Sequence, residues 1–116
     1  MKYFWSIFLF AIFTGCTNTK MSTNANLIEP GQTKADVTKI MGTPGDKQFQ
    51  GKDEAWQYCS TGVGGDKFVV VWFYDGIVTG MNTYTQNTGY GNCNKFYKRI
   101  DWQSAPDRTI EVRQKN

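Results

Sequence analysis

Few side chains in this sequence could carry out covalent or acid–base chemistry. The 116 residues include no histidine, which excludes histidine general bases, Ser-His and Cys-His nucleophile pairs and histidine-ligated metals. The chain has ten Asp and Glu residues, and the candidates among them form no recognisable catalytic pair: Asp53, Glu54, Asp66, Asp75 and Asp101. With a formal charge of +3 and no basic stripe, the chain lacks the pattern of a nucleic-acid-binding protein. We therefore expect a non-enzymatic protein without metal or cofactor, in which the three cysteines carry the chemistry.

The first cysteine ends a segment that has the layout of a secretory signal peptide. Lys2 precedes an apolar stretch over residues 3–13, which is too short for an ordinary membrane-spanning helix. The following Phe-Thr-Gly-Cys, ending at Cys16, resembles the lipobox of bacterial lipoproteins, in which cleavage before the cysteine leaves a lipidated thiol. The resemblance implies a signal peptide over residues 1–15 and acyl chains such as palmitate on Cys16. An ordinary signal peptide followed by an unmodified cysteine is the alternative.

The residue after Cys16 indicates which membrane is involved. Thr17 stands where enteric lipoproteins retained at the inner membrane commonly have Asp. The resemblance therefore implies a protein that is lipid-anchored in the outer membrane and faces the periplasm. Two or three acyl chains give stable anchoring, whereas one would be marginal. Residues 16–26 are small, polar and without periodicity, and we interpret them as a disordered tether to a single domain over residues 27–116.

If Cys16 carries lipid, two cysteines of this exported protein are left, and they can pair with each other. Disulfide bonds are the default in that setting, so we expect a structural bond between Cys59 and Cys93. A redox-active or metal-binding thiol pair is the alternative, but the sequence has no Cys-x-x-Cys spacing and no further ligands. The bond would enclose the most apolar part of the chain and tie a C-terminal extension to it.

That most apolar part predicts a β-hairpin over residues 67–84. Residues 67–74 are mostly β-branched or aromatic, and Asp75-Gly76 suits a type I′ turn. The turn sets the expected register: Tyr74 opposite Ile77, Phe73 opposite Val78, Trp72 opposite Thr79, Val71 opposite Gly80 and Val70 opposite Met81. Because both faces of the first strand are apolar, it should be central in its sheet, with a cover on each face.

A short helix is predicted before the sheet, over residues 34–41. Thr33 and Asp36 have the spacing of a capping box, and Gly42 with Pro44 ends the helix. Its apolar residues form one stripe: Val37, Ile40 and Met41. A helix this short must dock. We expect its stripe to cover the sheet face that carries Val69, Val71 and Phe73.

The remaining segments complete an α+β fold. Alternation over residues 54–60 predicts a strand before the hairpin, and residues 109–113 predict a last, edge strand. The glycine-rich residues 61–66 are interpreted as a mobile turn, and residues 95–102 fit either a helix or a strand. The expected fold is a short N-terminal helix packed on a three- to four-stranded antiparallel sheet. The second face would be covered by the tail after Cys93, by a partner, or by both.

Three motifs, in this order, resemble a known family. The first has the form L…GxTKxxVxxxxGxP over residues 27–44, and the others are Trp56-Gln57-Tyr58 and VWFYDGIV over residues 71–78. Together they resemble the SmpA/OmlA (BamE-like) family of small bacterial outer-membrane lipoproteins. The resemblance implies short helices packed on an antiparallel sheet, a fold that the family shares with β-lactamase inhibitor protein domains. The tail from Cys93 onward is not part of the family's pattern.

The family resemblance implies an interaction or scaffold module in envelope biogenesis, similar to the lipoprotein subunit of the outer-membrane β-barrel assembly machine. The candidate partner surface is an aromatic set expected on one sheet face, with burial in the core as the alternative: Trp56, Tyr58, Trp72 and Tyr74. A second hypothesis is an inhibitor of a periplasmic or secreted hydrolase that uses loops 61–66 and 85–92, and a third is a stress-induced envelope lipoprotein. For the basic residues in 95–99, a solvated face is favoured over contact with anionic lipid or peptidoglycan.

Overall fold

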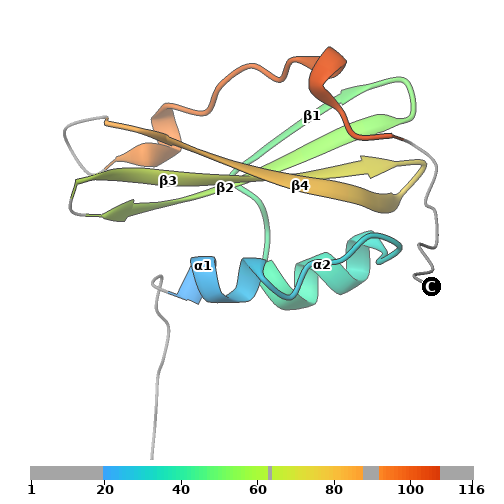
Figure 1. Ribbon diagram of the computed structural model, residues 1–116, viewed down its shortest axis with the longest axis horizontal. Helices are drawn as coiled ribbons and strands as arrows, with labels where there is room; N and C mark the ends of the chain where they lie inside the picture. Colours follow the sequence, from blue (N-terminus) through green and yellow to red (C-terminus); the bar gives the residue numbers. More distant parts are fainter. Residues whose placement is uncertain (1–19, 63, 88–91, 108–116) are drawn as a thin grey trace, which may run out of the picture.

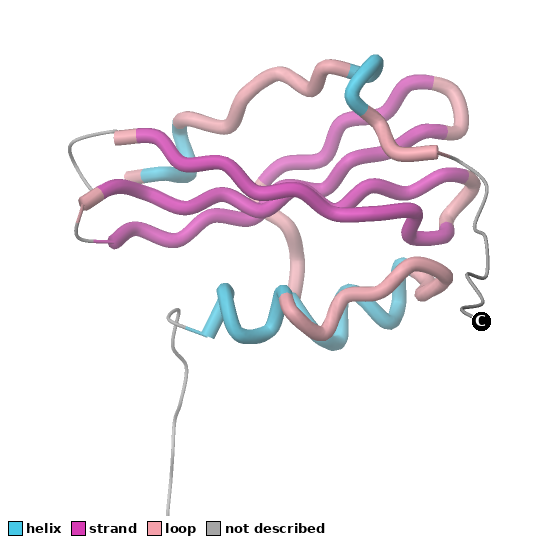
Figure 2. Tube along the Cα trace, in the orientation of Figure 1, coloured by secondary structure: helices cyan, strands magenta, loops and turns pink. Residues whose placement is uncertain are grey.

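The structure, a computed structural model, describes residues 20–62, 64–87 and 92–107. Two helices lie beneath one face of a sheet, and a segment without strands crosses the opposite face (Figures 1 and 2). The elements are α1 (Lys20–Ala25), α2 (Lys34–Met41), β1 (Asp46–Gln50), β2 (Asp53–Gly62), β3 (Gly65–Tyr74), β4 (Ile77–Gln86) and the 3₁₀ turns η1 (Cys93–Lys95) and η2 (Trp102–Ser104). The sheet is antiparallel in the order β1-β2-β3-β4, which confirms the predicted α+β class.

Strand β3 is the apolar run that the sequence placed inside the sheet, and it pairs with β2 and β4. The register to β4 starts as predicted and then shifts by one residue at a β-bulge, so that Trp72 lies opposite Gly80 instead of Thr79. The bulge inserts Thr79 as an extra residue between two paired positions, and Gly80 then lies close to Pro106 above the sheet. A Cβ on Gly80 would be 2.7 Å from Pro106 Cγ, so this position accepts only a glycine without displacing Pro106.

Helix α2 begins and ends where the sequence predicts. The Thr33 hydroxyl accepts a hydrogen bond from the Asp36 N–H at 3.1 Å, and the Asp36 carboxylate accepts one from the Thr33 N–H at 3.0 Å. The second of these bonds holds the pKa of Asp36 below its usual value. Val37 is fully buried in a core cluster with Val69, Val71 and Phe73. The predicted cover of this sheet face is therefore confirmed.

The capping box supports a test of the helix. Thr33→Ala should lower the free energy of unfolding by about 1 kcal/mol, because the Asp36 N–H loses its acceptor. Thr33→Ser keeps the hydroxyl and should unfold close to the parent protein in urea. The Asp36 carboxylate contributes stability above its ordinary pKa of about 3.9 and loses it as pH falls through the lowered folded value. Equal losses for the two variants would contradict this account of the cap.

The tether prediction is wrong from residue 20 onward, because residues Lys20–Ala25 form α1. Ala25 is buried in the core beneath the sheet, with Met21 packed against it and Ile28 following. The segment is rich in Ser, Thr and Asn, which have low helix propensity. Its only helical signal is the spacing of four residues between Met21 and Ala25, which is too weak to predict a helix. Burial against the sheet stabilises the helix instead.

The fourth strand also differs from the sequence prediction. It is β1, whose one apolar residue, Phe49, is 59% exposed, so no alternating pattern marks it. The predicted edge strand at residues 109–113 lies outside the described residues. The turn predicted over residues 61–66 is shorter than expected, because β2 and β3 stay paired as far as Gly62 opposite Gly65. Residues 96–101 form neither helix nor strand and lie between η1 and η2.

Candidate functional site

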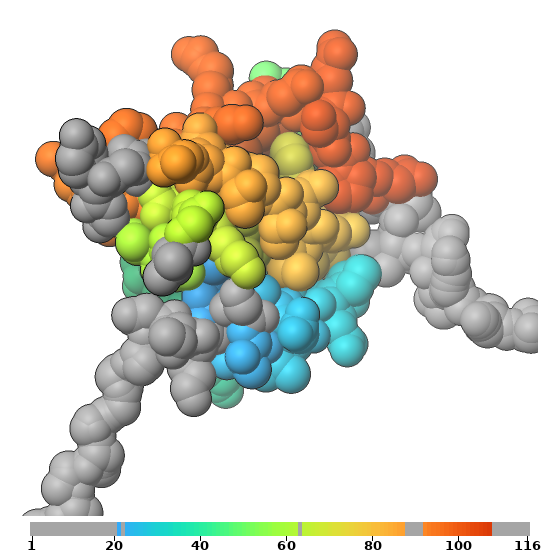
Figure 3. Space-filling model, turned by 60° about the vertical axis from the view of Figure 1, so that its left-hand side comes forward, coloured from blue at the N-terminus to red at the C-terminus, as the bar shows by residue number. Residues whose placement is uncertain are grey.

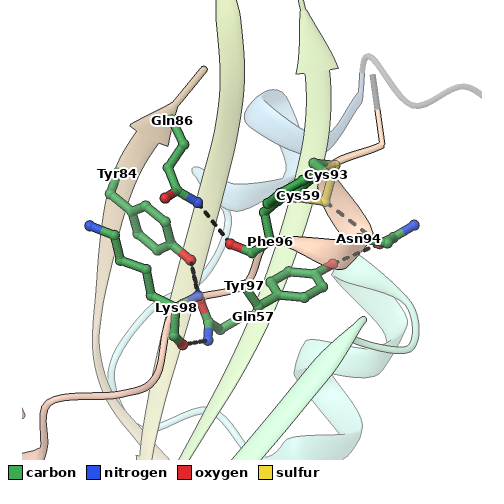
Figure 4. Close-up of a disulfide and its surroundings, with 9 residues drawn as sticks. All are labelled: Gln57, Cys59, Tyr84, Gln86, Cys93, Asn94, Phe96, Tyr97 and Lys98. Carbon is green, nitrogen blue, oxygen red and sulfur yellow. Dashed lines mark hydrogen bonds between the residues drawn. A yellow bond between two sulfur atoms is a disulfide. The ribbon is translucent and has the colours of Figure 1, made fainter. Parts of the chain in front are cut away.

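Residues 92–107 form a strap across the sheet face opposite the helices (Figure 1). The structure contains the expected disulfide at its start: the sulfur atoms of Cys59, on β2, and Cys93, in η1, are 2.07 Å apart (Figure 4). Farther along, Ile100 is buried in a second core cluster with Ala55, Val70 and Trp72. The strap therefore covers the second sheet face, which is one of the alternatives that the sequence leaves open.

Beneath the strap, the side chain of Gln57 is fully buried and fully bonded (Figure 4). Its Nε2 donates to Asp46 Oδ2 at 2.9 Å and to the Lys98 carbonyl at 2.8 Å. Its Oε1 accepts from the Tyr84 hydroxyl at 2.6 Å, and that hydroxyl accepts from the Lys98 N–H at 3.1 Å. Leaving such a buried group unpaired costs about 1–3 kcal/mol, so this network favours one position of the strap.

Two more glutamines bond the strap's backbone. Gln48 Nε2 donates to the Lys98 carbonyl at 3.1 Å, and its Oε1 accepts from the Ile100 N–H at 3.0 Å. Gln86 Nε2 donates to the Phe96 carbonyl at 2.7 Å. Sequence reasoning missed these residues, because glutamine at alternate strand positions resembles a solvent-facing residue. For Gln57 the one available signal was its place in a strand paired with the doubly apolar β3.

Aromatic packing completes the region around the disulfide. Phe68 is fully buried, stacks on Tyr84 with ring centroids 4.6 Å apart, and meets the edge of Tyr97 at 5.7 Å. Burial raises the pKa of both tyrosine hydroxyls. On the other sheet face, burial also raises the pKa of Tyr58, whose hydroxyl donates to the Gly42 carbonyl at 2.9 Å.

These raised pKa values predict alkaline destabilisation. A tyrosine whose folded pKa is raised contributes full stability below its unfolded pKa of about 10, and this contribution falls as pH rises towards the folded value. The urea midpoint should therefore decrease between about pH 9 and pH 11. Tyr58→Phe and Tyr84→Phe should each reduce the slope of that decrease, measured in a Cys16→Ser background that has no free thiol. An unchanged slope in both variants would contradict the assigned burial effect.

The predicted aromatic partner surface is wrong. Trp56 and Tyr58 face the helices, whereas Trp72 packs in the cluster under the strap, so the set is divided between two faces. Trp72 is only 4% exposed and contacts Trp102 at a centroid distance of 6.0 Å. Tyr74 is half-buried at the end of β3. Side chains alternate within each strand, but residues paired between β2 and β3 have opposite parity, as in Trp56 opposite Val71. Even-numbered residues of β2 and β3 therefore lie on opposite faces of the sheet.

The basic residues of the strap lie on its outer side. Lys95, Lys98 and Arg99 are exposed, and Phe96 is 43% exposed beside them. The Lys98 ammonium lies 4.9 Å from the centroid of the Tyr84 ring and makes a cation–π contact with it. These basic side chains thus lie at the surface of the strap.

A cleft of about 420 Å³ opens between α1 and the β3–β4 half of the sheet. Figure 3 shows this side of the molecule, with α1 in blue below β4 in orange. The cleft is lined by Met21, Ala25, Asn26, Lys67, Phe68, Val69, Met81, Thr83, Tyr84 and Thr85. Its volume lies in the range of about 300–1,000 Å³ that is typical of binding sites. Sequence reasoning missed the cleft because it interpreted the α1 wall as tether.

The described residues give two further findings. They hold no group of three or more His, Cys, Asp or Glu side chains placed to share a metal ion. Within the same residues, no helix is long and apolar enough to cross a membrane. Cys16, the predicted lipidation site, lies outside the described part of the chain.

Comparison with known proteins relates this architecture to a family. A model of the outer membrane protein assembly factor BamE domain matches residues 20–81, which run from the start of α1 into β4. The match covers more than half of the chain, and the strap with Cys93 lies beyond it. A search of curated proteins finds no significant match. On its helices, its sheet and this match, the chain belongs to the BamE family of outer membrane protein assembly factors.

Proposed function

We propose that this protein is a non-enzymatic interaction module that supports outer-membrane protein assembly. The observation that carries the proposal is the family match over residues 20–81, since its description names an assembly factor. The matched segment is the helix layer with most of the sheet, and the strap covers the face that the helices leave open. A sheet covered on both faces is suited to holding fixed surfaces for a partner protein.

The proposal includes an anchor on Cys16 and a place on the periplasmic face of the outer membrane. The lipobox-like sequence before Cys16 and the polar residues after it support this part. A short segment would join the anchor to the domain and keep the domain close to the membrane into which β-barrel proteins are inserted. Cys16→Ser should move the protein from the outer-membrane fraction to the soluble periplasmic fraction, measured by fractionation and by loss of metabolic palmitate labelling. Retention of the variant in the membrane would contradict lipid anchoring.

The test of the function is chemical crosslinking in native envelopes, followed by purification and mass spectrometry. We expect recovery of subunits of the β-barrel assembly machine with the anchored protein and a reduced yield with Cys16→Ser. Recovery of no envelope protein would overturn the scaffold role. The hydrolase-inhibitor hypothesis predicts inhibition of lysozyme or β-lactamase by the purified domain. The short β2–β3 turn gives that hypothesis no long plug at residues 61–66, so we expect both enzymes to keep full activity.

A further inference from the structure

The outer edge of β4 already accepts an extended segment at its start. The Gly31 N–H, in the linker between α1 and α2, donates to the Val78 carbonyl at 2.8 Å. The Val78 N–H donates to the Gln32 carbonyl at 2.9 Å. Past this point β4 continues to Gln86 as an end strand of the described sheet. An end strand presents unpaired N–H and C=O groups, which are a template for another strand.

The register identifies the later residues of β4 that direct these groups outward. Val78, whose groups point outward, lies opposite Phe73 of β3. Alternate residues of an antiparallel strand bond to the same neighbour, so every β4 residue opposite an odd-numbered β3 residue shares this orientation. Past the bulge there are three such pairs: Met81 opposite Val71, Thr83 opposite Val69 and Thr85 opposite Lys67.

The same three β4 residues line the cleft beside α1. A strand added along this edge would therefore send every second side chain towards the cleft. Met21, Ala25, Val69 and Met81 give the cleft apolar walls, while the neighbouring Thr83, Thr85 and Lys67 are exposed. The site thus suits a segment in which apolar residues alternate with polar ones. Strands of outer-membrane β-barrels have this alternation over about ten residues.

We propose that the outer edge of β4, from Met81 to Thr85, binds an extended segment of an unfolded outer-membrane β-barrel protein as an added strand. Backbone hydrogen bonds hold the segment, and the cleft beside α1 takes its alternate apolar side chains. This inference rests on the proposed assembly function and specifies its partner as the substrate chain. The linker at Gly31 limits the site at one end, because it already occupies the edge at Val78.

The probe is a fluorescein-labelled peptide of about ten residues, the length of a transmembrane strand, in which valine alternates with threonine. The control peptide has the same composition with its valines grouped together. Fluorescence polarisation with the purified domain should show about ten-fold tighter binding of the alternating peptide, a difference of about 1.4 kcal/mol. Equal affinity for the two peptides would overturn the proposal.

Variants of Thr83 test the place of binding. Proline at this position removes an N–H that the ladder to β3 does not use, and edge strands tolerate such a proline. Thr83→Pro should weaken binding about ten-fold or more, whereas Thr83→Val, which keeps the N–H, should bind as the parent does. Unchanged affinity in folded Thr83→Pro would overturn the site.

A second pair of peptides keeps the test valid if Thr83→Pro does not fold, as judged by thermal unfolding. One peptide is N-methylated at its odd-numbered amides and the other at its even-numbered amides. Because only one of these two sets of N–H groups points towards β4, one peptide should lose binding and the other should keep it. Equal affinity of the two N-methylated peptides would overturn strand addition. Failure of the peptide tests while assembly subunits are still crosslinked would overturn strand docking alone. Loss of those crosslinks would overturn the proposed function itself.

Discussion

Replacing both cysteines of the disulfide, by Cys59→Ser with Cys93→Ser, is expected to lower the free energy of unfolding by roughly 3–4 kcal/mol. The bond joins residues 34 apart in sequence, and it removes conformational freedom from the unfolded chain. A small domain has only about 5–15 kcal/mol of net stability, so this loss is a large fraction. Urea unfolding followed by tryptophan fluorescence measures the difference.

The strap should stay in place in this variant but open more often. Its hydrogen bonds to Gln48, Gln57 and Gln86 do not depend on the disulfide. We therefore expect the backbone amides of Lys98 and Ile100 to exchange hydrogen faster, while those of β3 remain protected up to global unfolding. Reduced parent protein is the matched control and should behave in the same way. A urea midpoint unchanged by both treatments would contradict the stabilising role of the bond.

The second large effect is expected from Phe73→Ala. Phe73 is 1% exposed in the core between the sheet and the helices, and its ring centroid lies 4.7 Å from that of Trp56. Truncation removes these contacts and leaves a cavity, which costs about 3–5 kcal/mol. We expect the urea midpoint to fall sharply or the domain to unfold.

Phe49→Ala is the matched control for Phe73→Ala. It makes the same chemical change on β1, where the side chain is 59% exposed, and should change stability by no more than about 0.5 kcal/mol. A Phe73→Ala variant as stable as Phe49→Ala would contradict the assigned core.

The parts of the fold that were predictable share a strong local signal. Helix α2 has a capping box and a terminating glycine, and the hairpin has Asp75 and Gly76, both at positive φ. The apolar run of β3 allowed only an inner strand. In contrast, α1 and β1 carry weak patterns, and tertiary contacts hold them in place. The bulge inserts Thr79 as an extra residue between the pairs of Phe73 and Trp72, which the two-residue turn at Asp75-Gly76 does not indicate.

The candidate site was less predictable for the same reason. The cysteine pairing followed from counting, since Cys59 and Cys93 were the even remainder. The division of Trp56 and Trp72 between two faces required the register between β2 and β3, which the hairpin alone does not fix. The cleft beside α1 required α1 itself. Burial of Trp72 thus moves the expected partner contact from the sheet face to the edge of β4.

Photocrosslinking in living cells tests this account most directly. A benzophenone amino acid would replace Thr83, on the outer edge of β4, and in a second strain Phe96, on the exposed side of the strap. We predict that position 83 crosslinks to β-barrel outer-membrane proteins, identified by mass spectrometry, and that position 96 gives few such crosslinks. Crosslinks to these proteins from position 96 but none from position 83 would contradict the account.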